Sequence, residues 1–88
     1  MPKIQLVVRN KVGLHARPAV LWVQTAQRFK ADIRVAKGEA EGNAKSFKSV
    51  LALAVNQDDA VTVRAEGPDA DEALAALSQL VADNFGEK

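Results

Sequence analysis

Hydrophobic and polar positions alternate in three parts of the chain, which predicts β-strands. Successive side chains of a strand point to opposite faces, so a period of two indicates one buried face. A further short strand is predicted near residues 41–44, because residues 38–42 favour a tight connection before it. The alternating apolar residues are Ile4, Leu6 and Val8, then Ile33 and Val35, and finally Val61, Val63 and Ala65.

Two longer segments carry apolar residues at helical spacing. The first begins near Ala16, has Pro18 in its first turn and is expected to end near Phe29 and Lys30. The second follows Gly67-Pro68, and Phe85 is expected to close it. The two apolar stripes consist of Ala19, Trp22, Val23, Ala26 and Phe29, and of Ala73, Leu74, Leu77, Leu80 and Val81. Trp22 is therefore expected to pack in the core rather than to contact a partner.

Polar residues predict two helix starts and one turn. Ser46 is predicted to cap a short helix from Phe47 to about Leu53. Asp69, with Glu72 three residues later, resembles a capping box with Asp in place of Ser or Thr. Residues 56–59, Asn-Gln-Asp-Asp, are predicted to form a polar turn.

The resulting element order is β-α-β-β-α-β-α in a single domain, residues 1–88. Short alternating strands and amphipathic helices favour an α+β fold of two layers. We expect an open-faced β-sandwich in which three helices cover one face of a four-stranded antiparallel sheet.

Composition excludes several classes of protein. The chain has no cysteine, so it forms no disulfide and no thiolate metal site. No apolar run approaches the ~20 residues that span a bilayer, and residues 1–4 do not begin a signal peptide. We therefore expect a cytoplasmic protein that does not insert into membranes.

The net charge of +1 conceals an asymmetry between the two halves of the chain. Residues 1–48 hold ten of the twelve Lys and Arg, and residues 49–88 hold eight of the eleven acids. A basic half favours acidic protein partners or anionic ligands, unless the two halves neutralise each other in the fold. Nucleic acid is a weaker interpretation, because no basic run is interleaved with aromatic residues.

His15 is the only histidine, and Arg17 follows it where a strand gives way to a helix. A helix start offers unpaired N–H groups and partial positive charge, which bind anions. The same charge favours a neutral, nucleophilic imidazole, and Arg17 adds a forked donor. These features suggest phosphoryl chemistry at His15.

Other interpretations of these residues are possible. A single histidine at a helix start is often a surface or capping residue, and Arg17 by itself is a solvated charge. A metal site lacks a second histidine or a cysteine. A Ser-His-Asp site lacks a nucleophile-elbow pattern around Ser46, Ser49 or Ser78.

Residues 13–19, Gly-Leu-His-Ala-Arg-Pro-Ala, resemble the active-site signature of the HPr family, the histidine-containing phosphocarriers of the bacterial sugar phosphotransferase system. Residues 43–46, Asn-Ala-Lys-Ser, followed by a short helix, extend the resemblance over the whole chain. It implies that Nδ1 of His15 accepts a phosphoryl group from Enzyme I and passes it to sugar-specific IIA proteins or domains. Ala16 and Arg17 would bind the phosphoryl group. The resemblance implies a carrier without cofactor, not an enzyme acting alone, and we expect a monomer.

The resemblance also implies a regulatory role for Ser46, as a substrate of HPr kinase/phosphorylase and a contact for a transcriptional regulator. The alternative is that Ser46 only caps a helix. Phe47, Lys48 and Leu51 would form the partner surface. Ser46 is usually followed by an apolar, flexible segment, whereas Lys48 adds charge and Ser49 replaces a typical glycine.

Three other functions compete with a carrier of the sugar branch. A carrier of the nitrogen-related phosphotransferase branch would use the same chemistry at His15, although Ser46 favours the sugar branch. A purely regulatory module acting through the Ser46 surface is disfavoured, because paralogues of that type lack the histidine. A hydrolytic enzyme would need a second reacting group, for which the sequence offers no candidate.

Overall fold

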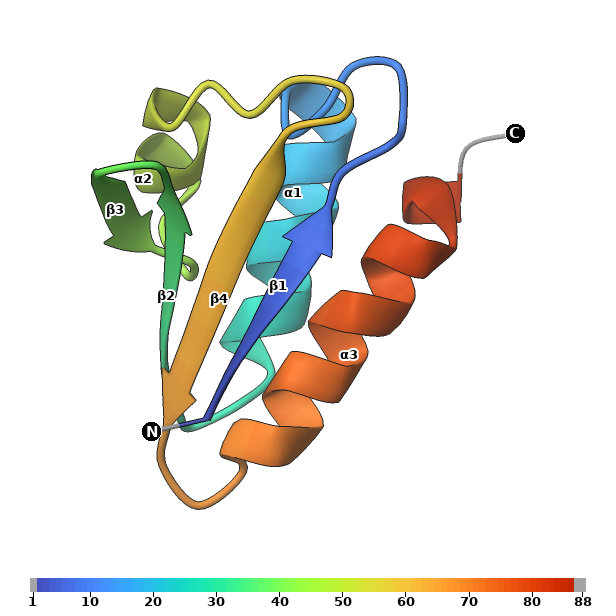
Figure 1. Ribbon diagram of the computed structural model, residues 1–88. Coiled ribbons are helices and arrows are strands. Elements are labelled where there is room, and N and C mark those ends of the chain that lie inside the picture. Colours follow the sequence, from blue (N-terminus) through green and yellow to red (C-terminus); the bar gives the residue numbers. More distant parts are fainter. Residues whose placement is uncertain (1, 87–88) are drawn as a thin grey trace.

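The computed structural model describes residues 2–86 and consists of a sheet with helices packed against one face (Figure 1). The predicted order of strands and helices is confirmed. Met1, Glu87 and Lys88 of the predicted domain lie outside the described residues. The elements are β1 (Lys3–Val7), α1 (Ala16–Gln27), β2 (Asp32–Lys37), β3 (Ala40–Asn43), α2 (Phe47–Ala52), β4 (Ala60–Glu66), α3 (Ala70–Ala82) and a 3₁₀ turn over Asn84–Gly86.

The four strands form one antiparallel sheet in the order β1-β4-β2-β3. β4 therefore lies inside the sheet, with Val63 opposite Ile4 of β1 on one side and opposite Val35 of β2 on the other. The alternating residues of β2 and β4 face the helices and are buried. The predicted two-layer α+β architecture is confirmed.

The core lies between this sheet face and the apolar stripes of α1 and α3. Trp22 is fully buried, which confirms its packing role. The first helix is shorter than predicted: it ends at Gln27, and Phe29 packs against the core from the following turn. Phe85 is buried as predicted, but in the 3₁₀ turn rather than in α3.

The predicted capping box at the start of α3 is wrong. Asp69 is the N-cap residue of α3, but its side chain makes no capping hydrogen bond. Its two carboxylate oxygens instead accept hydrogen bonds from the backbone N–H groups of Lys30 and Ala31, both at 2.8 Å. Asp69 therefore ties the turn before β2 to the start of α3. The sequence spacing could not indicate this, because the donors lie 38 and 39 residues away.

This contact predicts pH-dependent stability. The Lys30 N–H group, followed by that of Ala31, holds the pKa of Asp69 below its ordinary value of 3.8. A carboxylate with a lowered pKa stabilises the fold above that ordinary value and loses the effect as the pH falls through the lowered pKa. We expect Asp69→Asn to unfold at a lower Tm than the wild type at neutral pH, with a difference that shrinks in acid. Thermal melts of both proteins across this range test it, and an undiminished difference in acid would contradict the assignment.

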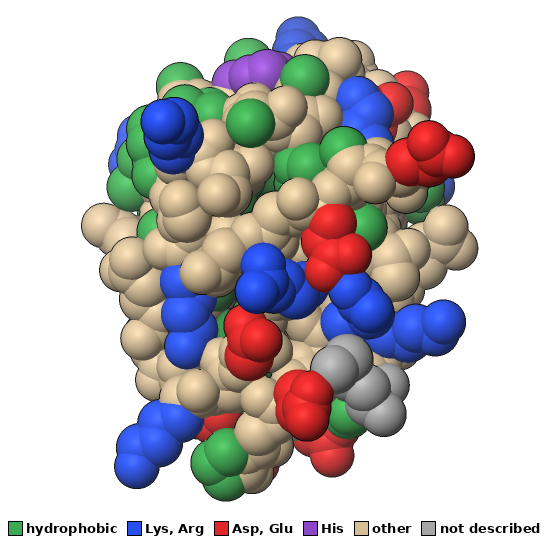
Figure 2. Space-filling model, turned by 90° about the vertical axis from the view of Figure 1, so that its left-hand side faces the viewer, with side chains coloured by type: hydrophobic (Ala, Val, Ile, Leu, Met, Phe, Trp, Pro, Cys, Tyr) green, Lys and Arg blue, Asp and Glu red, His purple; other side chains and the backbone are tan. Residues whose placement is uncertain are grey.

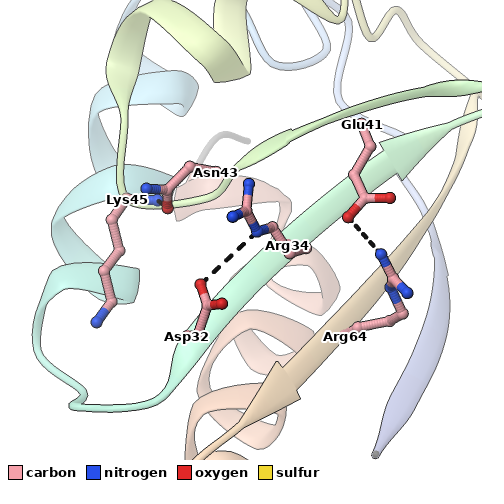
Figure 3. Close-up of polar contacts among 6 residues, drawn as sticks. All are labelled: Asp32, Arg34, Glu41, Asn43, Lys45 and Arg64. Carbon is pink, nitrogen blue, oxygen red and sulfur yellow. Dashed lines mark hydrogen bonds and ion pairs between the residues drawn. The ribbon is translucent and has the colours of Figure 1, made fainter.

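The sheet face away from the helices is polar. Arg34 of β2 and Arg64 of β4 lie directly opposite each other, an arrangement that is unfavourable for like charges. Figure 3 shows how each is paired: Arg34 lies 3.7 Å from Asp32, and Arg64 pairs with Glu41 of β3. Within residues 2–86, the pairs Arg64–Glu41 and Lys37–Asp59 join the two halves of the chain. Only Lys37–Asp59 sets a base of the basic half against an acid of the acidic half, so neutralisation between the halves by ion pairs is slight.

No helix among the described residues is long and apolar enough to cross a bilayer.

Candidate functional site

The loop between β1 and α1 is held tightly against the segment between α2 and β4. Leu14 N–H donates to the Val55 carbonyl oxygen at 2.9 Å, and the Leu14 side chain is fully buried. Buried Asn10 closes the preceding turn, since its Nδ2 donates to the Gly13 carbonyl at 2.9 Å. A Cβ atom on Gly13 would lie 2.2 Å from Val55 O, and the φ of Gly13 is +60°. Only glycine fits this close approach without distortion.

His15 follows as the N-cap residue of α1. Its backbone is extended, with φ −115° and ψ 156°, and its side chain makes no capping hydrogen bond. The simple capping interpretation is therefore wrong. Ala16 has a φ of +48°, a left-handed conformation that costs a non-glycine residue about 1–2 kcal/mol. The strained residue is the first of α1 and directly follows His15, and buried Pro18 and Ala19 anchor this first turn.

The imidazole of His15 contacts Asn56, which lies 41 residues later in the chain. His15 Nε2 and Asn56 Oδ1 are 3.0 Å apart. A carboxamide oxygen only accepts, so Nε2 carries the proton in this bond and the neutral ring has its lone pair on Nδ1. Within residues 2–86 this is the one hydrogen bond of the ring. The half-buried ring is thus fixed at one nitrogen and presents the other.

Ala16 and Arg17 are both exposed beside this ring. The first-turn N–H groups of a helix have no partner within the helix, so those of Ala16 and Arg17 can bind an anion. Among the described residues Arg17 forms no ion pair, and its side chain borders a cavity of about 280 Å³ that Pro18, Leu21, Phe85 and Gly86 also line. An anion at the start of α1 would thus meet backbone N–H donors.

Hydrophobic side chains are exposed on the surface near the histidine. Figure 2 shows the histidine, in purple, at one end of the molecule with hydrophobic side chains close by. Among the described residues, the large apolar side chains that are more than one-third exposed are those of Val7, Val12, Val20 and Phe47. The predicted partner residues differ in exposure: Phe47 and Lys48 are exposed, whereas Leu51 is half-buried. The surface can receive a partner with an apolar patch.

Ser46 lies away from His15, toward the other end of α1. Lys45, the preceding residue, bonds to Gln27 through its carbonyl at 3.0 Å and to the Phe29 carbonyl through its ammonium at 2.6 Å. Both partners lie at the carboxyl end of α1, whereas His15 lies at the amino end. The Ser46 hydroxyl accepts a 3.3 Å hydrogen bond from Ser49 N–H, which confirms the predicted N-cap of α2.

The sequence motif did not reveal Asn56. Residues 56–59 were predicted only as a polar turn, which the structure confirms: Asp59 N–H donates to the Asn56 carbonyl at 3.0 Å. An asparagine in a turn has many local uses, so its type alone gives no signal of a contact with a distant histidine. Within residues 2–86 no cluster of His, Cys, Asp or Glu is arranged to hold a metal ion.

The fold and the site define a small domain that presents one oriented histidine on an apolar surface. Residues 2–83 match the family model described as the PTS HPr component phosphorylation site. The phosphocarrier protein HPr of Mycoplasma pneumoniae is 42% identical over 82 residues, covering 92% of this chain and 93% of that protein. The chain therefore belongs to the HPr family of phosphocarrier proteins, and it serves in a phosphoryl relay rather than as an enzyme.

Solved structures agree with this assignment. HPr-C-His from Thermoanaerobacter tengcongensis superposes with a TM-score of 0.98 at 44% identity, covering 100% of this chain and 99% of that one. The swapped dimer of Crh, the Bacillus subtilis catabolite repression protein, superposes with a TM-score of 0.75 at 42% identity, covering 94% and 95% of the two chains.

Proposed function

We propose that His15 is the phosphorylated residue of this carrier and that Nδ1 is the atom that bonds to phosphorus. The observation that supports this best is the contact between His15 Nε2 and Asn56 Oδ1. It holds the proton on Nε2 and leaves the lone pair on Nδ1. The match to a family model described as a phosphorylation site also supports phosphorylation of this chain.

In the proposed transfer, the Nδ1 lone pair forms a bond to phosphorus while the bond from phosphorus to the donor breaks. The electron pair of that bond leaves with the donor, and the proton on Nε2 stays on the ring. Arg17 and the first-turn N–H groups of Ala16 and Arg17 stabilise the negative charge on the phosphoryl oxygens. The remaining contribution is positioning, which dominates catalysis of phosphoryl transfer.

We assign phosphorylated Enzyme I as the donor and IIA proteins or domains as the acceptors. Exposed Val12, Val20 and Phe47 provide apolar contact area, and Arg17 and Lys48 provide positive charge. Such a surface suits transient complexes with partners whose docking faces combine apolar and acidic groups. The protein is proposed to act as a cytoplasmic monomer in the sugar branch, with the nitrogen-related branch as the alternative.

The proposal is tested by incubation with phosphoenolpyruvate and Enzyme I. We expect one phosphate per chain, labile in acid and stable in base, which then moves to a sugar-branch IIA protein. Enzyme I and IIA proteins of the nitrogen-related branch serve as the parallel arm. Absence of phosphate with both donors would contradict the carrier mechanism, and transfer only with the nitrogen-related proteins would reassign the branch.

We further propose that Ser46 is a regulatory phosphorylation site. Its hydroxyl already accepts from Ser49 N–H, so a phosphate there would stay at the start of α2 beside exposed Phe47 and Lys48. The similarity to Crh, a catabolite repression protein, supports a regulatory role for this chain.

Incubation with ATP and an HPr kinase tests the role of Ser46. We expect acid-stable phosphate on the wild type and none on Ser46→Ala, with Ser49→Ala still modified. We also expect phosphorylated Ser46 to slow transfer to His15 at least severalfold. The phosphate adds negative charge to the surface that meets the acidic groups of the partner. Equal labelling of Ser46→Ala would refute the site, and an unchanged transfer rate would refute its regulatory effect.

A further inference from the structure

A series of contacts outside the Gly13–Ala19 motif connects His15 to strand β2. It runs through Asn56, Asp59 and Lys37. β2 and β4 are antiparallel neighbours with Ala36 opposite Thr62, so Lys37 lies beside the segment that leads into β4. Lys37 Nζ is 2.9 Å from Asp59 Oδ2, and both side chains are 32% exposed. The Lys37 ammonium also donates to the Ala54 carbonyl at 2.7 Å. Lys37 therefore fixes both ends of the 54–59 segment.

Asp59 carries this constraint to Asn56. The Asn56 N–H donates to Asp59 Oδ2 at 2.8 Å, and the Asp59 N–H donates back to the Asn56 carbonyl at 3.0 Å. The bond from the Asn56 N–H, followed by that from Lys37, lowers the pKa of Asp59. Its carboxylate thus stays ionised, and an ionised acceptor forms the stronger hydrogen bonds.

The other side of the turn is held by β1. Val8 N–H donates to the Asp59 carbonyl at 3.0 Å, and Asp58 N–H donates to the Val8 carbonyl at 2.6 Å. These bonds continue the pairing of β1 with β4 beyond Val7. The backbone around Asn56 is thus tied to β1 directly and to β2 through Lys37. Its side chain reaches His15 from a constrained turn rather than from a loose loop.

We infer that Lys37, Asp59 and Asn56 form a positioning chain for His15. Asn56 orients the imidazole, holds its proton on Nε2 and stabilises the positive charge that the ring gains when Nδ1 bonds to phosphorus. Asp59 and Lys37 act on His15 only through Asn56, by fixing the turn that carries it. This inference rests on the proposed phosphorylation of His15 and adds the residues that prepare it. None of the three is a phosphoryl acceptor.

The first test compares two replacements of Asn56. Asn56→Asp keeps an oxygen acceptor for Nε2–H, whereas Asn56→Leu has similar size without one. We expect Asn56→Leu to slow phosphoryl transfer from Enzyme I roughly three- to tenfold, the effect of one ordinary hydrogen bond. Asn56→Asp is expected to transfer faster than Asn56→Leu because it keeps the acceptor oxygen, and Gln57→Ala in the same turn is expected to transfer at the wild-type rate. An Asn56→Leu rate equal to that of wild type would overturn the inference.

The second test asks whether Asp59 acts through Asn56. We expect Asp59→Ala to slow transfer by a smaller factor than Asn56→Leu. The Asn56→Leu/Asp59→Ala double variant should be no slower than Asn56→Leu alone, because coupled residues do not give additive effects. If Asp59 acted independently of Asn56, the rate reductions of the two single variants would instead multiply in the double variant. That result would overturn the proposed positioning chain.

A third readout separates this inference from the proposed function. Because the protein has one histidine, ¹⁵N-histidine labelling gives two ring signals from the unphosphorylated protein. We expect the wild type to carry its proton on Nε2, and Asn56→Leu to shift population toward the Nδ1–H form. Identical ring spectra would refute the role of Asn56 even if His15 is phosphorylated. Changed spectra without phosphorylation by either Enzyme I would refute the proposed function alone.

Discussion

Replacing His15 by alanine is expected to abolish phosphoryl transfer from Enzyme I. The chain has no second histidine and no cysteine that could accept the phosphoryl group in place of His15 at the start of α1. Arg17 and the first-turn N–H groups can still hold an anion, but without Nδ1 no bond to phosphorus forms. Phosphate incorporation from phosphoenolpyruvate, measured per chain, should fall from one to background.

The control for this experiment is Gln24→Ala. Gln24 is an exposed residue of the same helix, and we expect its variant to accept phosphate as the wild type does. His15 is half-buried, and its ring makes one hydrogen bond to the described part of the chain, so His15→Ala should retain a stability within about 1 kcal/mol of wild type. Acid-labile phosphate on a folded His15→Ala protein would show that another residue is the acceptor.

Replacing Gly13 by alanine is expected to cause the largest loss of stability. The added Cβ would lie 2.2 Å from Val55 O and 2.7 Å from Asn56 Cα. Both are backbone atoms, so relief requires the His15 loop to move away from the 54–59 segment. We expect a loss of about 2–4 kcal/mol, which corresponds to a fall in Tm of more than about 8 °C for a domain of this size. Transfer should also slow, because the same movement separates His15 from Asn56.

Gly38→Ala provides the matched control for Gly13→Ala. Both glycines have a φ of +60°, but a Cβ built on Gly38 would have no described atom within 4 Å apart from Gly38 itself and its two chain neighbours. Gly38→Ala therefore carries only the backbone cost of about 1–2 kcal/mol, and we expect normal transfer. Chemical denaturation of both variants measures the difference. Equal losses would mean that the close approach to Val55 contributes little.

The sequence predicted the layers of this fold because the strands and helices have strong periodicities of their own. The apolar helix stripe around Trp22 must be buried against another apolar surface, and so must the apolar strand face that contains Val61 and Val63. In a two-layer domain these two surfaces cover each other. The helix ends were less well predicted. The first helix stops at Gln27, although Phe29 continues its stripe, because burial of Phe29 does not require helical backbone.

The sequence predicted the residues of the candidate site that lie close together along the chain, but not those that reach it from a distance. His15, Ala16, Arg17 and Gly13 are close in the sequence, so the local motif contains them all. Asn56 contacts His15 across 41 residues, and Asp69 contacts Ala31 across 38. Asn and Asp form local turns and caps in most sequences, and a local pattern therefore favoured those roles for both.

By itself, the sequence indicated His15 as the candidate phosphoryl acceptor and the start of a helix as its place, because the motif around a lone histidine is a local feature. It also determined the two-layer fold through the periodicity of its apolar residues. Only the tertiary structure decided which ring nitrogen of His15 is held, and it placed Ser46 toward the opposite end of α1. Those outcomes depend on strand pairing that brings Lys37, Asp59 and Asn56 together, and such pairing is set by the packing of the whole chain.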